Sequence, residues 1–71
     1  MFNAQTVLNM IGDPCLKLYR RKGYHWYFEF DDTELFATKR VMVSALNDLP
    51  LDTWVREGRT FAAAMRAKHK R

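Results

Sequence analysis

Hydrophobic positions near the N-terminus recur at helical spacing and then stop. The spacing over residues 4–11 predicts a short helix with one apolar side. Asn3 suits the N-cap, Gly12 suits the left-handed position that follows a helix, and Pro14 cannot continue one. The apolar positions of this helix are Ala4, Val7, Leu8 and Ile11.

Strict alternation replaces the helical spacing over residues 15–21. Leu16 and Leu18 fall on one side, which predicts a half-buried strand. A short connection at residues 21–23, whose glycine can take a positive φ, predicts a hairpin into the next strand. The other side of the first strand carries Lys17, Tyr19 and Arg21.

Residues 24–30 hold five aromatic side chains, which is typical of the middle strand of a small sheet. Their alternation separates a strongly apolar face from a mixed one, and the apolar face is expected to be buried. The apolar face is Tyr24, Trp26, Phe28 and Phe30. The mixed face is His25, Tyr27 and Glu29.

A turn and a third strand follow. The polar run at residues 31–34 favours chain reversal, because Asp and Thr side chains bond their own backbone. Residues 35–43 then form a strand whose alternation is compatible with either side facing the core. An inward side of Leu35, Val41 and Val43 leaves Phe36, Thr38, Arg40 and Met42 outside.

From residue 46 the spacing becomes helical again, and it predicts a long C-terminal helix. Asp48 is the expected N-cap, Pro50 suits the first turn, and Asp52 complements the helix dipole. Gly58 lies within the apolar stripe, where a glycine lets the helix backbone approach a bulky aromatic such as Trp26 or Phe28. The stripe is Leu51, Trp54, Val55, Gly58, Phe61, Ala62 and Met65.

The expected fold is therefore α+β in the order α-β-β-β-α. A three-stranded antiparallel meander has a short N-terminal helix and a long C-terminal helix packed on one face. Residues 1–71 make one domain, with residues 67–71 frayed. The sequence leaves open whether the N-terminal helix covers the second face of the sheet.

Size and cysteine content set the class of protein. A chain of 71 residues builds one modest core, and a single cysteine, Cys15, allows no internal disulfide. A reducing compartment and a cytoplasmic location are expected. No apolar run reaches the length of a membrane span, and the N-terminus lacks the pattern of a secretion signal.

The net charge of +4 is concentrated at the C-terminus. Basic and acidic side chains balance over residues 1–61, so the body of the domain is neutral. The basic isoelectric point therefore comes mainly from the charges of the C-terminal tail, which weakens the usual inference of nucleic-acid binding. The tail charges are Arg66, Lys68, Lys70 and Arg71.

The second face of the sheet is the main candidate site. Aromatic side chains beside arginine are common at protein interfaces, and aromatics with basic groups also make stacking platforms for bases. Three alternatives remain open: binding of a protein, binding of nucleic acid, and burial, either under the N-terminal helix or against a second copy. The candidate partner-binding residues are Lys17, Tyr19, Arg21, Tyr27, Phe36 and Arg40.

Two further charged features are weighed against ordinary explanations. A basic flank of the C-terminal helix could contact phosphates, or it could be a solvated side near a helix C-terminus. The two hairpin tips have opposite charge, which could steer a partner or simply reflect turn chemistry. The flank is Arg56, Arg59, Arg66 and Lys70; the tips are Arg20, Arg21 and Lys22 against Asp31, Asp32 and Glu34.

No enzyme, cofactor or metal site is predicted. The acidic tip lacks the length and spacing of a calcium loop, and one thiol with two unpaired histidines does not make a zinc site. Cys15 and His25 would act as a nucleophilic pair only if the fold brought them together. The chain also lacks a glycine-rich phosphate loop.

About half of the chain resembles small uncharacterised proteins encoded by phages and prophages. The stretches that carry the resemblance are Gly23-Tyr24-His25-Trp26-Tyr27-Phe28, Asp31-Asp32 and Leu46-Asn47-Asp48-Leu49-Pro50-Leu51-Asp52-Thr53-Trp54-Val55-Arg56-Glu57-Gly58. The resemblance implies an accessory protein that binds and disables a host protein or ribonucleoprotein complex, for example a CRISPR or other defence complex. A nucleic-acid-binding accessory domain and a structural homo-oligomer, such as a homodimer, are the alternatives.

Overall fold

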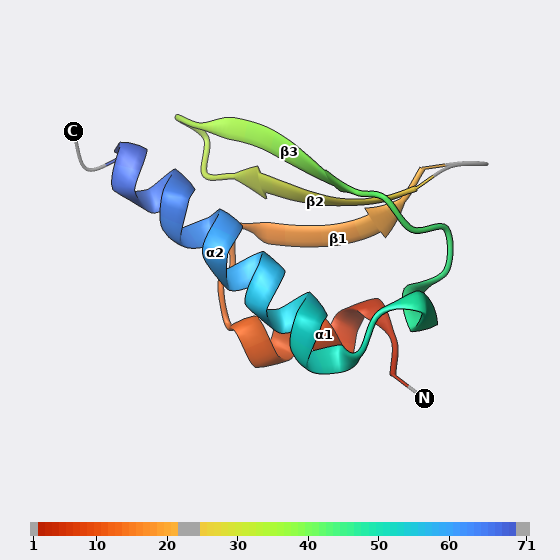
Figure 1. Cartoon of the computed structure of the whole chain (residues 1–71). Helices are drawn as coiled ribbons and strands as arrows, with labels where there is room; N and C mark the ends of the chain where they lie inside the picture. The colour runs from red at the N-terminus through yellow and green to blue at the C-terminus, as the bar shows by residue number, and fades with distance from the viewer. Residues whose placement is uncertain (1, 22–24, 70–71) are drawn as a thin grey trace.

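The chain folds as a helix, three antiparallel strands and a longer second helix, so the α+β class and the α-β-β-β-α order are confirmed (Figure 1). The computed structural model describes residues 2–21 and 25–69. Lys22, Gly23 and Tyr24 lie outside the described residues, and with them most of the expected first turn. The elements are α1 (Ala4–Ile11), β1 (Leu16–Arg20), β2 (Trp26–Asp31), β3 (Phe36–Val41), the 3-10 turn η1 (Leu46–Asp48) and α2 (Leu51–His69).

Helix α1 begins and ends at the residues that the sequence predicts. The Asn3 side chain accepts a hydrogen bond from the Thr6 N–H at 2.9 Å, which satisfies a donor of the first turn. Gly12 follows the helix with a φ of +79°, and its N–H donates to the Leu8 carbonyl at 2.9 Å. A left-handed residue in this position closes the last turn.

The sheet places β2 in the centre, paired antiparallel with both neighbours. Leu16, Leu18 and Phe28 are buried, which confirms the predicted inner face. The structure also shows which side of the third strand faces solvent, because Phe36 and Met42 are each 64% exposed. The expected inward residues of that strand, Leu35, Val41 and Val43, are half-buried and pack against the core.

Aspartate side chains build the turn between β2 and β3. Asp31 accepts a hydrogen bond from the Thr33 N–H at 3.1 Å, and Asp32 accepts one from the Leu35 N–H at 2.7 Å. These bonds are the ones by which aspartate stabilises reversal. Turn chemistry therefore accounts for both aspartates of the acidic tip.

Helix α2 begins later than predicted, and the assignment of Asp48 as its N-cap is wrong. The Asp48 carboxylate instead accepts the Ala45 N–H at 3.3 Å, within η1. The Pro50 carbonyl accepts the Trp54 N–H at 3.2 Å, so Pro50 is the residue at which the helix starts its bonding. The helix continues through His69, so residues 67–69 are helical.

Both helices lie on the same face of the sheet (Figure 1). Helix α1 packs on α2 and β1, and α2 packs on β2. The alternative in which α1 covers the second face is therefore wrong, and no described element covers that face. No helix in the described part of the chain combines the length and hydropathy needed to cross a bilayer.

Gly58 allows α2 to lie close to the sheet. A Cβ atom at this position would stand 3.0 Å from ring carbons of Phe28 and would collide with the Ile11 side chain. The predicted close approach of helix and aromatic is thus confirmed for Phe28. The fully buried side chains around it are Val7, Phe28, Phe30 and Trp54.

Candidate functional site

The candidate site is the face of the sheet that carries no helix, here named the outer sheet face. Alternation along each strand puts its side chains opposite the buried ones. The structure brings together on this face all six residues that the sequence proposes for partner binding. The outer sheet face consists of Lys17, Tyr19, Arg21, His25, Tyr27, Glu29, Asp31, Phe36, Thr38, Arg40 and Met42.

Two tyrosines form an ordered row at the centre of this face. Tyr19 and Tyr27 lie opposite each other on β1 and β2, with ring centroids 6.3 Å apart and ring planes 19° apart. The Arg21 guanidinium lies over the Tyr27 ring, 4.7 Å from its centroid. Tyr19 and Arg21 thus both contact Tyr27, and the row is organised before any partner binds.

Glu29 fixes the orientation of the tyrosine row. The Tyr19 hydroxyl donates a hydrogen bond to Glu29 Oε1 at 3.1 Å, and Lys17 Nζ lies 4.0 Å from Glu29 Oε2. The Glu29 side chain is 17% exposed, whereas that of Lys17 is 68% exposed. The carboxylate is therefore engaged within the face, while the lysine remains accessible to a partner.

Strand β3 contributes side chains that have no internal partner. Phe36 and Met42 are exposed hydrophobic side chains, and Arg40 lies directly across from Tyr27. Within the described part of the chain, the Arg40 guanidinium makes no hydrogen bond, ion pair or ring contact. An exposed arginine with two exposed apolar side chains, Phe36 on β3 and Met42 just after it, is typical of a protein interface.

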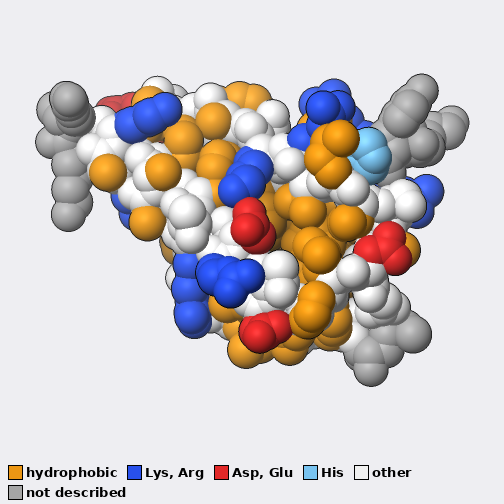
Figure 2. Space-filling model, viewed as in Figure 1, with side chains coloured by type: hydrophobic (Ala, Val, Ile, Leu, Met, Phe, Trp, Pro, Cys, Tyr) orange, Lys and Arg blue, Asp and Glu red, His pale blue; other side chains and the backbone are white. Residues whose placement is uncertain are grey.

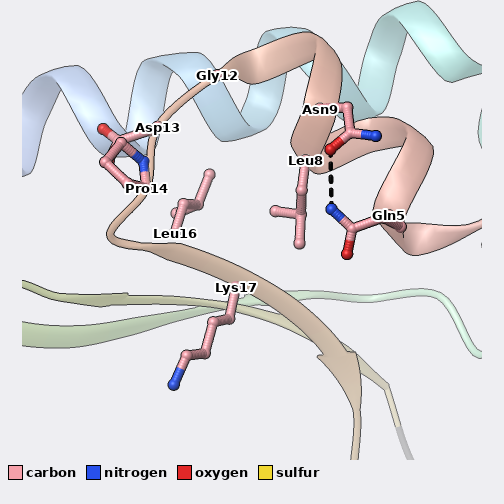
Figure 3. A pocket seen from close by; sticks show the side chains of 8 residues that line it. All are labelled: Gln5, Leu8, Asn9, Gly12, Asp13, Pro14, Leu16 and Lys17. Carbon is pink, nitrogen blue, oxygen red and sulfur yellow. Dashed lines mark hydrogen bonds between the residues drawn. The ribbon is translucent and has the colours of Figure 1, made fainter.

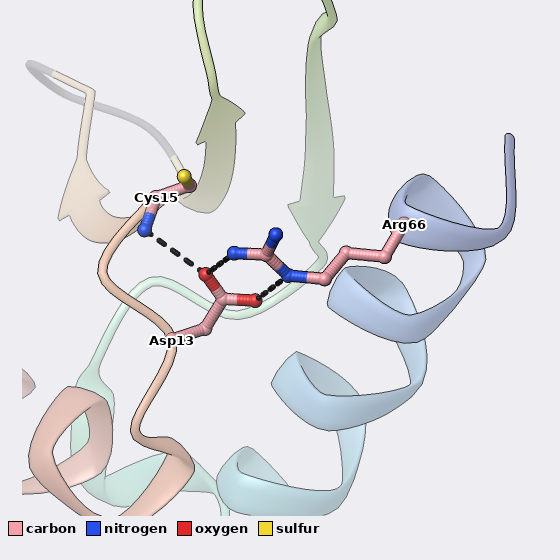
Figure 4. A network of polar contacts seen from close by, with 3 residues as sticks. All are labelled: Asp13, Cys15 and Arg66. Carbon is pink, nitrogen blue, oxygen red and sulfur yellow. Dashed lines mark hydrogen bonds and ion pairs between the residues drawn. The ribbon is translucent and has the colours of Figure 1, made fainter. Parts of the chain in front are cut away.

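The basic flank of α2 is only partly free. Arg66 donates two hydrogen bonds to the Asp13 carboxylate, at 2.9 and 2.6 Å (Figure 4). Its guanidinium also lies over the Phe30 ring, 5.3 Å from the ring centroid. Arg59 donates to the Met10 carbonyl at 3.0 Å. Arg56 is exposed, and Lys70 lies outside the described residues. Two of the four predicted phosphate contacts are thus engaged in holding α2 to the α1–β1 region.

The Asp13–Arg66 pair shifts the titration of both groups. The hydrogen bond from Arg66 lowers the pKa of the Asp13 carboxyl, in opposition to burial, which raises it. The Cys15 N–H also donates to Asp13 at 2.9 Å and further lowers the pKa. The same pairing raises the pKa of Arg66, so the guanidinium stays charged.

An open groove of about 650 Å³ lies between α1 and β1 (Figure 3). Leu8 and Leu16 point into the space between the two elements, and the Gln5 amide donates to the Asn9 side chain at 2.8 Å on the helix. Sequence reasoning misses this groove, because its walls come from α1, the Gly12–Pro14 connection and β1 without a shared motif. Its polar side chains are largely satisfied within the chain.

The two chemical sites considered from the sequence are a metal site and a Cys15–His25 pair, and the described residues assemble neither. No group of three or more His, Cys, Asp or Glu side chains is placed to hold a metal ion among them. The Cys15 carbonyl accepts the Asp31 N–H, whereas the His25 carbonyl accepts the Arg21 N–H. Cys15 and His25 therefore stand at opposite ends of the β1–β2 ladder and are not brought together.

Comparisons with known proteins add no family to this picture. No family model, no curated protein and no solved structure matches the chain.

Proposed function

We propose that this chain is a non-catalytic binding module that takes a protein partner on its outer sheet face. One observation carries the proposal: this face has no covering layer in the described structure, and it presents Phe36, Arg40 and Met42 without internal partners. Such side chains contribute most of the binding energy where a partner can desolvate them. The ordered Tyr19–Tyr27 row beside them lowers the entropy lost on binding.

A protein partner fits this face better than a strand of nucleic acid. The Tyr27 ring already stacks with Tyr19 and lies beneath the Arg21 guanidinium, so a stacking base would compete with these contacts. The exposed apolar side chains Phe36 and Met42 instead suit a hydrophobic partner surface, with Lys17 and Arg40 at its margins.

The phage-type resemblance supplies the finer part of the proposal. In this proposal the partner is a host protein or ribonucleoprotein complex in the cytoplasm, including defence complexes of the CRISPR kind. The module acts by occupying a working surface of that complex, which needs neither a cofactor nor a chemical step.

The proposal is tested by capture from host lysate followed by measured affinity. A tagged chain is used with and without nuclease, and the recovered protein is then titrated with purified variants. Tyr27→Ala and Arg40→Ala are each expected to weaken binding by about 2 kcal/mol, close to thirtyfold. Arg56→Ala, which removes an exposed cation from α2, is the matched control and should bind as the original does. Unchanged affinity for both outer-face variants would show that the partner binds elsewhere.

A nucleic-acid partner is the second candidate, because three cations surround the tyrosine row. Lys17, Arg21 and Arg40 stand against two carboxylates, that of Glu29 at the centre of the face and that of Asp31 at the end of β2. A strand face of this kind can enter the major groove of duplex DNA. Affinity for duplex DNA would then fall steeply with added salt. Absent or salt-independent binding at low salt removes this candidate.

A further inference from the structure

Strand β3 is an edge strand whose outward backbone groups are unpaired in the described structure. The Asp32 N–H donates to the Leu35 carbonyl and the Trp26 N–H donates to the Val43 carbonyl. The backbone N–H and C=O groups of the odd-numbered residues between Leu35 and Val43 therefore point toward β2. By the alternation of an antiparallel ladder, the N–H and C=O groups of Phe36, Thr38 and Arg40 point away from the sheet. Such an edge is a template for another strand.

We propose that β3 pairs antiparallel with β3 of a second copy of this chain, centred on Thr38. The pairing makes one continuous sheet across both copies, with the two-fold axis passing through the Thr38 pair. It places both pairs of helices on one side and both outer sheet faces on the other. This inference concerns the free edge, so it stands whether or not the outer sheet face binds a partner as proposed above.

Charge selects this register among those that the backbone allows. Centring on Thr38 sets Phe36 opposite Arg40 of the second copy, twice by symmetry, which permits a cation–π contact on each side. Centring on Lys39 would set two ammonium groups face to face, and centring on Arg40 would do the same with two guanidinium groups. Centring on Ala37 would leave only residues 36–38 of β3 paired within the strand, whereas centring on Thr38 pairs residues 36–40.

The helix side of β3 is also complementary to itself in this register. Helix α2 packs over β2, and hydrophobic side chains remain visible between α2 and β3 (Figure 2). Leu35 and Val41 are both half-buried there, and the pairing sets each opposite the other in the second copy. Ala37 comes opposite Lys39, and its small side chain leaves room for the lysine stem. The Lys39–Glu57 ion pair, at 2.8 Å, neutralises that charge within each copy.

The other free edge is less suited to self-pairing. Strand β1 has α1 packed beside it, with the groove of Figure 3 between them. Figure 1 shows β3 at the edge of the sheet remote from α1, where a second sheet can approach without meeting a helix. The edge of β3 is therefore the one that fits a second copy.

Sedimentation of the purified chain tests the proposal directly. Between about 1 μM and about 1 mM, the mass is expected to rise from that of one chain to that of two. Thr38→Pro removes an N–H that faces the free edge and not β2, so the monomer fold is expected to survive while the dimer is lost. Circular dichroism of Thr38→Pro at low concentration confirms that the fold is kept.

Opposite charges at Phe36 test the register itself. Phe36→Lys sets like charges opposite Arg40 twice and is expected to raise the dissociation constant at least tenfold. Phe36→Glu sets opposite charges there and should keep the dimer, and the double variant Phe36→Lys with Arg40→Glu should restore it. Phe36 is exposed, so these changes leave the monomer core intact.

Each outcome decides for or against the proposal. A chain that stays monomeric near 1 mM overturns it. So does a dimer that persists in Thr38→Pro, or equal affinities for Phe36→Lys and Phe36→Glu. These measurements use the chain alone, so they fail or succeed independently of the lysate capture and of Tyr27→Ala.

Discussion

At the scale of single residues, Gly58 is the position where a general rule is expected to reverse. Alanine normally stabilises a helix interior by about 1 kcal/mol relative to glycine. Here the added methyl group would press on the Phe28 ring at 3.0 Å and collide with the Ile11 side chain. Gly58→Ala is therefore expected to lower the free energy of unfolding by about 1–3 kcal/mol, as overpacked cores do. Urea denaturation measures the change.

An exposed alanine on the same helix calibrates this result. Ala63 lies on the solvent side of α2, so Ala63→Gly is expected to cost only the propensity difference of about 1 kcal/mol. A stabilising Gly58→Ala would mean that α2 can move away from β2 at little cost, and the close packing of helix on sheet would not hold.

At the scale of elements, two tryptophans connect η1, α2 and β2 by different means. Trp54 is fully buried, and its indole N–H donates to the Leu46 carbonyl at 2.7 Å, which joins α2 to η1. Trp26 packs against it edge to face with centroids 6.1 Å apart, but its own buried N–H has no hydrogen-bond partner in the described structure. Of the two indole rings, only that of Trp54 therefore contributes a hydrogen bond in the described structure.

Replacement of each tryptophan by phenylalanine separates these contributions. Trp54→Phe deletes a part-buried hydrogen bond and reduces the volume of a fully buried ring, so a loss of about 2–3 kcal/mol is expected. Trp26→Phe removes an unsatisfied buried donor together with some volume, so its cost should be at least about 1 kcal/mol smaller. Thermal unfolding of both variants provides the comparison. Equal losses would show that ring volume alone decides stability at this junction.

At the scale of the whole molecule, the sequence predicts which face of each strand is buried better than it predicts the contacts that join distant segments. Alternation at Leu16, Leu18 and Phe28 identifies the inner face, because a strand with one buried side tolerates no shift of register. The outer sheet face follows by the same period. The hairpin register predicts that Tyr19 and Tyr27 lie opposite each other. It does not predict their ring contact, because that contact depends on how each side chain is oriented.

The contacts that join distant segments leave no such pattern. Arg66 belongs to a basic flank by its helical spacing, but its partner Asp13 stands 53 residues earlier and is found only once the chain has folded. Arg59 and the Met10 carbonyl are similarly remote in sequence. Local spacing places a side chain on an element, whereas its partner depends on how the elements pack. Two residues of the predicted basic flank, Arg59 and Arg66, therefore bind other segments of the chain in the structure.

The Asp13–Arg66 ion pair predicts how the stability of the whole molecule changes at acidic pH. Because Arg66 lowers the pKa of Asp13 in the folded state, the unfolded chain binds a proton at a higher pH than the folded one. The pair's contribution is therefore complete above the ordinary carboxyl pKa of about 4, and it is lost as the pH falls through the lowered folded value. Asp13→Asn removes this titration, so its melting temperature should lie below that of the original chain at pH 7 and converge with it toward pH 2. A gap of constant size across that range would mean that the ionised state of the Asp13 carboxyl adds no stability to the folded chain.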